Sequence, residues 1–281
     1  MNYWTKFFTL FANLLSLAIW PGVMAGSSAR VLIYSATVDF RHDSIPTAIQ
    51  ALKIEAPLDQ VNDNTLARYD ALLFLMNTGE VLNNTGKAAL QNYLDVGGNF
   101  IAVHAAADAD ALRNTTFYGR ELDAYFDYHP ALQNATVDVI DASNPSGRYN
   151  FKLDPHDVGA VVVLSANESS YVDTGTHMDQ GNPHPIAWYQ EHGAGIEGGG
   201  TAGRSFYTNL GHLNESWMDD TFMAHVLGGV KRVLLSNRTK VHNSSALAIG
   251  NGNSSTSVTS LLPTSSSSTS VPSVIHPSND V

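Results

Sequence analysis

One stretch decides the fold: Gly97-Gly98-Asn99-Phe100-Ile101-Ala102-Val103-His104-Ala105-Ala106-Ala107-Asp108. The apolar run Phe100–Val103 predicts a buried strand, and the small residues that follow His104 predict a sharp turn. In open α/β sheets, ligands bind at the carboxyl ends of the strands, so the histidine is expected to face a cleft. An imidazole at this position favours proton transfer, metal ligation or polar contact with a substrate over formation of an acyl-enzyme.

Strands and helices alternate around this stretch. Strands are predicted at Arg30–Ala36 and Ala71–Met76, and helices at about Pro46–Ile54 and at Asn84–Val96, which Gly97-Gly98 ends. This order of strand, helix, strand, helix, strand is typical of a parallel sheet.

The patterns in the second half are weaker. Phe117–Phe126 is a candidate helix, and Asp219–Leu235 is a clear amphipathic helix with Asp219 or Asp220 as its cap. Four segments are rich in β-formers: Ala135–Ile140, Ala160–Ser165, Pro185–Tyr189 and Arg204–Leu210. The glycine-rich insertion Gly193–Gly203 predicts a hairpin loop.

Further histidines follow predicted strands or turns. His212 comes after the last predicted strand and is the second candidate for a functional side chain, while His42 follows the first strand and is expected at the same edge of the sheet. His129 is either a site residue or a turn histidine. His184 precedes Pro185, which favours an extended backbone that can point into a cleft or toward solvent.

The two ends of the chain indicate export. Residues 1–25 resemble a secretory signal, with Lys6, an apolar stretch too short for a membrane span, and Val23-Met24-Ala25 as a cleavage site. Asn-X-Ser/Thr acceptor sites for glycosylation begin at Asn83, Asn114, Asn134, Asn167, Asn214, Asn237, Asn243 and Asn253. Residues 237–281 form a tail rich in Ser and Thr that is expected to be disordered. We therefore expect a secreted glycoprotein with no membrane span after cleavage.

Composition excludes several functions. The chain of 281 residues has no cysteine, which rules out disulfides and cysteine-dependent amidotransferase chemistry. Its formal net charge of −11, without a basic stripe, argues against nucleic acid as a partner. Histidines together with Asp39 or Asp108 offer ligands for a metal, but no short metal-binding signature is present, so no metal is assigned and the cofactor stays unknown.

Five motifs in order resemble those of the ThuA-like (trehalose utilisation) family. They are Phe40-Arg41-His42-Asp43-Ser44-Ile45-Pro46, Tyr69–Leu75 followed by Asn77-Thr78-Gly79, Gly97–Ala106, His184–Tyr189, and Arg204–His212. The resemblance covers residues 30–236. It implies a flavodoxin-like, class I glutamine amidotransferase-like α/β fold, a three-layer sandwich with a mostly parallel central sheet. It also implies that His104 stands where amidotransferases carry their cysteine, and it associates the chain with carbohydrate use.

Two regions depart from the family pattern. The region Leu52–Asp70 is short, so the usual second strand is reduced to Ala56–Val61 or lost. The region Tyr149–Val161 lacks the acidic-aromatic segment of the family, so a glutamate from that segment would be missing from the site.

These observations lead to one main expectation and two alternatives. A small carbohydrate, as a sugar or an oxidised sugar, is expected at the sheet edge, where His104 and His212 transfer protons or orient the substrate and His42, His129 and His184 contact it. One alternative is a noncatalytic carbohydrate-binding domain, which the missing acidic segment supports. The other is a cell-wall-associated glycoprotein held by its Ser/Thr-rich tail.

Overall fold

A mixed sheet of seven strands forms the centre of the molecule. The computed structural model describes residues 29–52, 66–108, 116–122, 125–138 and 149–237. In spatial order the strands are β1 (Val31–Tyr34), β2 (Ala71–Leu75), β3 (Asn99–Val103), β9 (Ser205–Thr208), β8 (Pro185–Gln190), β7 (Val161–Ala166) and β5 (Val137–Asp138). The strands β1, β2, β3 and β9 pair in parallel, while β8, β7 and β5 each run antiparallel to the preceding neighbour. Most strands therefore share one direction, and the expected mostly parallel sheet is confirmed.

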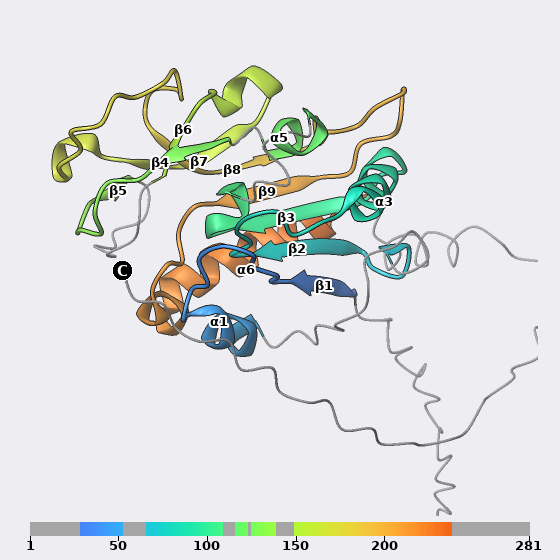
Figure 1. Ribbon diagram of the computed structural model, residues 1–281, viewed down its shortest axis with the longest axis horizontal. Helices are drawn as coiled ribbons and strands as arrows, with labels where there is room; N and C mark the ends of the chain where they lie inside the picture. The colour runs from blue at the N-terminus through green and yellow to red at the C-terminus, as the bar shows by residue number, and fades with distance from the viewer. Residues whose placement is uncertain (1–28, 53–65, 109–115, 123–124, 139–148, 238–281) are drawn as a thin grey trace, which may run out of the picture.

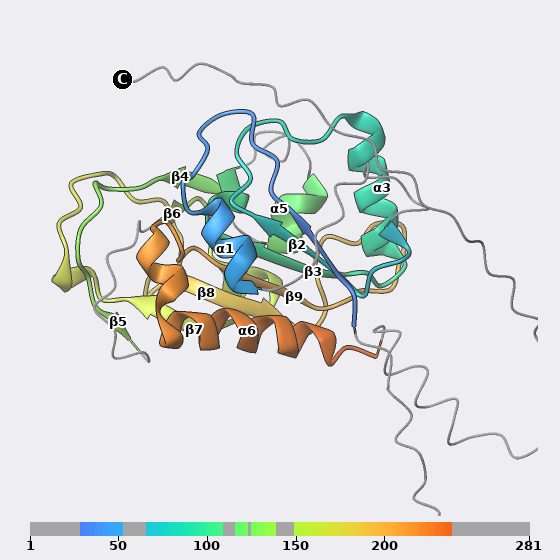
Figure 2. The same cartoon turned by 90° about the horizontal axis from the view of Figure 1, so that it is seen from below.

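Helices cover both faces of the sheet (Figures 1 and 2). The helices α1 (Ile45–Leu52) and α6 (Asp220–Leu234) lie on one face, and α3 (Asn84–Asp95) and α5 (Thr116–Leu122) lie on the other. Side chains of β3 alternate between the two resulting cores: Phe100 and Ala102 pack on the α3 side, and Ile101 and Val103 on the α6 side. The predicted three-layer α/β sandwich is thus confirmed.

The central strands are apolar because both of their faces are covered. Every residue of β2 and β3 is buried, as expected for parallel strands between two helical layers. Each large apolar side chain buried in this way contributes roughly 1.5–3 kcal/mol to stability. Burial of this kind holds the carboxyl ends of β1, β2, β3 and β9 in fixed register.

Local signals set the helix boundaries. The Asn83 side chain accepts a hydrogen bond from the Gly86 amide at the start of α3, and Asp219 caps α6 by accepting from the Phe222 amide at 2.7 Å. Gly97 adopts a φ of 91°, which ends α3 before β3 begins. Of the two predicted caps, Asp219 and Asp220, the structure has Asp219, and the helix stop predicted at Gly97-Gly98 is confirmed.

One predicted helix is too long. The segment Phe117–Phe126 was expected to be helical, but α5 ends at Leu122 and Phe126 begins the strand β4 (Phe126–Tyr128). β4 pairs antiparallel with β6 (Asn150–Phe151) in a separate two-stranded sheet. The aromatic residues of β4 favour a strand, and Phe126 packs against Tyr149 instead of continuing the helix.

Short 3-10 helices and one hairpin complete the fold. The 3-10 helices are η1 (His104–Asp108), η2 (Pro155–Val158), η3 (Glu168–Ser170) and η4 (Asn214–Met218). The predicted hairpin at Gly193–Gly203 is confirmed, since it joins the antiparallel strands β8 and β9. The predicted signal, the reduced strand at Ala56–Val61 and most of the Ser/Thr-rich tail lie outside the described residues. Within the described part, none of the helices has both the length and the hydropathy of a membrane span.

Candidate functional site

His104 lies in a sharp turn directly after β3. Its φ is 59°, in the left-handed region that residues other than glycine seldom adopt, and its side chain is fully buried. The Tyr207 hydroxyl donates to the His104 carbonyl at 3.0 Å and holds the turn in place. Backbone strain of this kind collects at functional sites, and the predicted sharp turn is confirmed.

Two other histidines meet His104 at the same edge of the sheet. His42 comes from the loop between β1 and α1, and His212 from the loop between β9 and η4. The His104 Nε2 atom lies 3.1 Å from His42 Nε2 and 3.0 Å from His212 Nδ1. The parallel pairing of β1, β2, β3 and β9 explains the meeting, because these loops leave the sheet at one edge. We call His42, His104 and His212 the histidine cluster.

Polar contacts from neighbouring loops hold the cluster. Thr78, which follows β2, donates its hydroxyl to the Phe40 carbonyl at 2.7 Å and so fixes the loop that leads to His42. Ser44, just before α1, donates to the His212 carbonyl at 2.7 Å. These two bonds tie the loops after β1 and β9 to their neighbours, so the backbone beside His42 and at His212 is fixed.

The hydrogen bond of His104 to the backbone fixes its tautomer. The Nδ1 atom lies 2.7 Å from the Asn209 carbonyl oxygen, which can only accept, so Nδ1 carries the proton. In the neutral ring, Nε2 then presents a lone pair to His42 and His212. A lone pair with a fixed direction is what proton transfer or metal ligation requires.

Tyr149 is a site residue that the sequence analysis missed. Its hydroxyl lies 3.1 Å from His104 Nε2, and Tyr149 directly precedes β6 in the chain. The ring packs against His104 and Phe126, with centroid distances of 4.9 and 4.7 Å. Tyr149 is the first residue of the region Tyr149–Val161, which departs from the family pattern. That position was the only feature of the sequence that pointed to it.

His184 lies behind Tyr149 instead of inside the histidine cluster. Its side chain is buried, and its Nε2 lies 3.0 Å from the Tyr149 carbonyl oxygen. Its Nδ1 lies 3.0 Å from the Tyr171 hydroxyl and 3.2 Å from a Glu168 carboxylate oxygen. His184 therefore positions the backbone of Tyr149, and through it the hydroxyl that reaches His104.

His129 lies on the outer side of Tyr149. It is exposed, its ring stacks on the Tyr149 ring at a centroid distance of 5.6 Å, and its Nδ1 lies 2.9 Å from the Pro130 carbonyl. The structure thus brings His42, His104 and His212 into direct contact, and it places His129 against the ring of Tyr149 and His184 against its backbone carbonyl.

Burial keeps the cluster uncharged. Desolvation lowers the pKa of His104 well below its usual value, with a smaller effect in the same direction from His42. Desolvation also lowers the pKa of His42 to about 4 and lowers that of His212, and neighbouring histidines add to both shifts. All three imidazoles are therefore neutral near pH 7.

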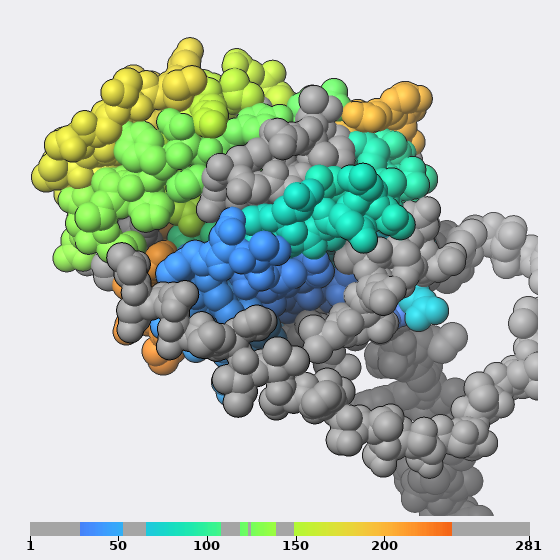
Figure 3. Space-filling view, viewed as in Figure 1, coloured from blue at the N-terminus to red at the C-terminus, as the bar shows by residue number. Residues whose placement is uncertain are grey.

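Phe40 marks the solvent side of the site. It is 64 % exposed, its ring meets His42 edge-on at 4.8 Å, and it lies parallel to the half-buried His212 at 6.5 Å. In the space-filling view, the blue segment that carries β1 and α1 adjoins the green segment that carries β4 (Figure 3). An aromatic face beside polar nitrogen atoms is suited to a ligand with both an apolar and a polar side.

The histidine cluster is also the one group of potential metal ligands among the described residues. Its three ligand nitrogens all lie within 4.8 Å of one another. Asp39, proposed from sequence as a partner, is exposed and is not part of the group, and the Asp108 side chain lies outside the described residues.

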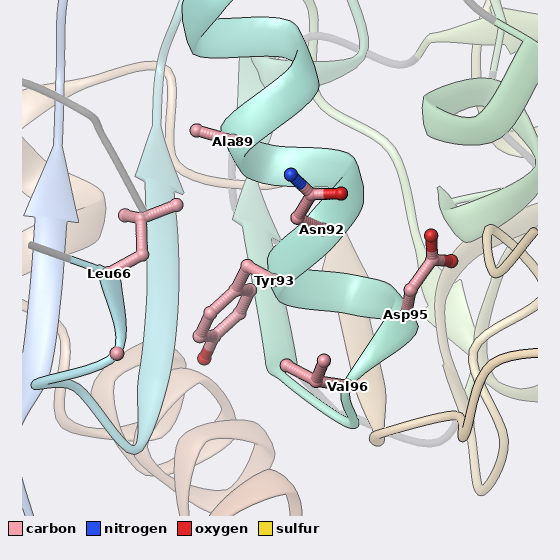
Figure 4. A pocket seen from close by; sticks show the side chains of 7 residues that line it. Leu66, Ala89, Asn92, Tyr93, Asp95 and Val96 are labelled. Carbon is pink, nitrogen blue, oxygen red and sulfur yellow. The ribbon is translucent and has the colours of Figure 1, made fainter. Parts of the chain in front are cut away.

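A separate pocket lies at the opposite edge of the sheet (Figure 4). It has a volume of about 350 Å³ and is lined by Leu66, Ala67, Ala89, Asn92, Tyr93, Asp95 and Val96, at the end of α3 that precedes β3. Its single acidic side chain has no histidine beside it in the lining. The histidine cluster is therefore the better candidate for chemistry.

Comparisons with known proteins agree with this architecture. A family model described as trehalose utilisation, ThuA, matches residues 30–232. A ThuA-like protein from Bacteroides uniformis superposes with a TM-score of 0.59 at 17 % identity, over 80 % of this chain and 99 % of that one. A second, from Parabacteroides merdae, gives 0.50 at 12 % identity, over 74 % and 91 %. No curated protein matches the chain.

Proposed function

The chain belongs to the ThuA, or trehalose utilisation, family, and from that premise we propose that it acts on a sugar or an oxidised sugar at the histidine cluster. Family membership supports a role in sugar use and leaves the reaction open. In this proposal His104 and His212 hold the reacting oxygen of the sugar, and His42 and Tyr149 complete the polar wall around it.

The observation that carries the proposal is the convergence of three polar side chains on His104 Nε2. His42, His212 and the Tyr149 hydroxyl all lie 3.0–3.1 Å from this one atom. Such a group is costly to bury unless its members gain partners, so its presence indicates a function for the polar atoms. A hydroxyl or carbonyl oxygen of a sugar is a ligand of matching size and polarity.

The surroundings also suit a sugar. Sugars present C–H groups on the ring faces and hydroxyls around the edge, and the site offers an aromatic ring at Phe40 next to the half-buried imidazole of His212. His129 adds a second exposed ring, stacked on Tyr149. In the proposal, His129 contacts the sugar from the solvent side, whereas His184 acts through Tyr149.

Secretion is part of the proposal and is supported by sequence alone. Residues 1–25 have the charge, apolar stretch and small-residue cleavage site of a signal, and glycosylation acceptor sequences are frequent. The tail rich in Ser and Thr offers a means of association with a cell wall. Fractionating the culture medium from wall material, with an antibody against the chain, tests both points.

A panel of sugars tests the function. The full-length secreted protein is incubated with trehalose, glucose and their keto derivatives, and binding and products are measured by calorimetry and NMR. His104→Ala and His212→Ala should each lower turnover by at least about 100-fold, since each removes a group that contacts the reacting oxygen. The exposed His156, which bonds to Asp154, gives the matched control His156→Ala, which should leave turnover unchanged.

Two results would decide against this account. Turnover that is unchanged in both His104→Ala and His212→Ala would remove the proposed roles of the cluster. Binding of a sugar without turnover, retained in His104→Ala, would identify the chain as a noncatalytic carbohydrate-binding protein.

A further inference from the structure

The histidine cluster converges on a single lone pair, and the buried Nδ1 atom of His42 has no hydrogen-bond partner in the structure. With its Nδ1 proton donated to the Asn209 carbonyl, His104 has one lone pair left, on Nε2. Three polar atoms approach that lone pair: His42 Nε2, His212 Nδ1 and the Tyr149 hydroxyl. One such lone pair accepts one well-directed hydrogen bond, so His42 Nε2 and His212 Nδ1 cannot both donate to it.

A metal ion between the imidazoles would give these nitrogens a shared partner. In tetrahedral zinc sites the metal–nitrogen distance is about 2.0–2.1 Å, which places two ligand nitrogens roughly 3.3 Å apart. His104 Nε2 lies at 3.1 Å from His42 Nε2 and 3.0 Å from His212 Nδ1, so small outward movements of the rings would admit the ion. We propose that His42, His104 and His212 bind one divalent transition-metal ion of the zinc type.

The surroundings of the cluster match those of a metal centre with three protein ligands. A ligating histidine commonly donates its other ring N–H to a backbone carbonyl, as His104 does to Asn209. Three neutral ligands leave both positive charges on the ion and leave a fourth coordination position open, which is typical of catalytic sites. Among the described residues, the group holds no carboxylate that would reduce this charge.

Tyr149 has a distinct place in this centre. Its hydroxyl lies within hydrogen-bond distance of the same His104 nitrogen that would ligate the ion, so it can contact an oxygen bound at the open position. The part of the inference that concerns chemistry rests on the proposed function: the ion would polarise the sugar oxygen held there. Metal binding itself rests on the geometry of the three imidazoles.

Titration of metal-free protein tests the site. The full chain, prepared with a chelator and without a histidine tag, is titrated with Zn²⁺ by calorimetry and with Co²⁺ by visible absorption, which reports the number and arrangement of ligands. We expect tight binding of one ion at the cluster and a spectrum of low coordination number. His42→Gln, His104→Gln and His212→Gln should each weaken binding by at least about 100-fold, and His156→Gln should not.

The outcomes separate this inference from the proposed function. Zinc affinity that is the same in the three cluster variants and in His156→Gln would overturn the metal site. If His104→Gln fails to fold, the half-buried His212→Gln, checked by circular dichroism, decides the question. Sugar turnover by protein that binds no metal would support the proposed function and reject the metal site. Metal binding at the cluster without any interaction with sugars would support the metal site and reject the proposed function.

Discussion

At the scale of single residues, His104 owes its direction to two backbone contacts. The Asn209 carbonyl fixes which ring nitrogen carries the proton, and the Tyr207 hydroxyl anchors the strained turn through the His104 carbonyl. Neither contact involves a charged group, so the neutral ring is held by hydrogen bonds instead of by ion pairing. Tyr149 then provides an O–H group at the remaining lone pair, on Nε2 of the buried ring.

Tyr149→Phe tests the role of this hydroxyl. The change removes one oxygen and keeps the ring, so stability should fall by about 1 kcal/mol at most. Turnover of the sugar should fall by about 10-fold or more, while zinc affinity should hardly change because the phenol is not one of the three ligands. Steady-state kinetics, zinc calorimetry and thermal unfolding check these results, with Tyr189→Phe on β8 as the control. Full activity in Tyr149→Phe would contradict the assignment.

At the scale of elements, the position of His212 depends on a glycine. Gly211 has a φ of 113°, and a Cβ added there would lie 3.1 Å from Phe222 and 3.2 Å from Trp217. The Trp217 indole also donates to the Gly211 carbonyl at 2.8 Å. This glycine lets the chain turn from β9 into η4 and carry His212 toward His104.

Gly211→Ala should therefore destabilise the protein and disturb the site. We expect a loss of roughly 1–3 kcal/mol in the free energy of unfolding, from backbone strain and crowding. Because His212 is the next residue, zinc affinity should also fall. Urea unfolding and zinc titration measure the two effects. Gly228→Ala, at a helical position of α6 with open space around it, should instead be neutral or slightly stabilising.

The hairpin between β8 and β9 covers a buried acid, Glu121 of α5. Burial raises the pKa of the Glu121 carboxyl to about 8, and the hydrogen bond from the Gly195 amide at 2.9 Å opposes this shift. The folded-state pKa lies above the unfolded value of 4.5. The contribution of the protonated carboxyl to the free energy of unfolding is therefore fully present below about pH 4.5. It is lost as the pH rises through about 8.

Glu121→Gln should remove this pH dependence, because the amide cannot ionise and still accepts from Gly195. Between pH 5 and pH 8 the wild type should lose on the order of 3 kcal/mol relative to the variant. Urea unfolding at the two pH values provides the measurement. If wild type and Glu121→Gln differ in unfolding free energy by the same amount at pH 5 and at pH 8, Glu121 does not stay protonated in the folded protein.

Strong local patterns explain why many elements could be predicted. The apolar runs of β2 and β3, the cap at Asp219 and the glycines after α3 are local signals, and all were confirmed. By contrast, β4 and β6 are short strands that depend on each other, and α5 was therefore predicted too long. Contacts between distant segments carry no local signal, which is why Tyr149 was missed.

At the scale of the whole molecule, the α/β sandwich brings together the residues of the site from segments that are far apart in the sequence. His42, Tyr149 and His212 lie 62, 45 and 108 positions from His104, yet each reaches the same imidazole nitrogen. His42, His104 and His212 meet because they follow β1, β3 and β9, and these parallel strands end at the same edge of the sheet. Tyr149 directly precedes β6 of the two-stranded sheet, which lies beside that edge (Figure 1).

The most direct test of the account is a crystal structure of the protein soaked with Zn²⁺ and with the sugar that it turns over or binds. We expect anomalous zinc density among the imidazole nitrogens of His42, His104 and His212, with an oxygen of the sugar beside it and beside the Tyr149 hydroxyl. A sugar bound elsewhere, for example in the pocket at the end of α3, with the histidine cluster unchanged, would contradict it.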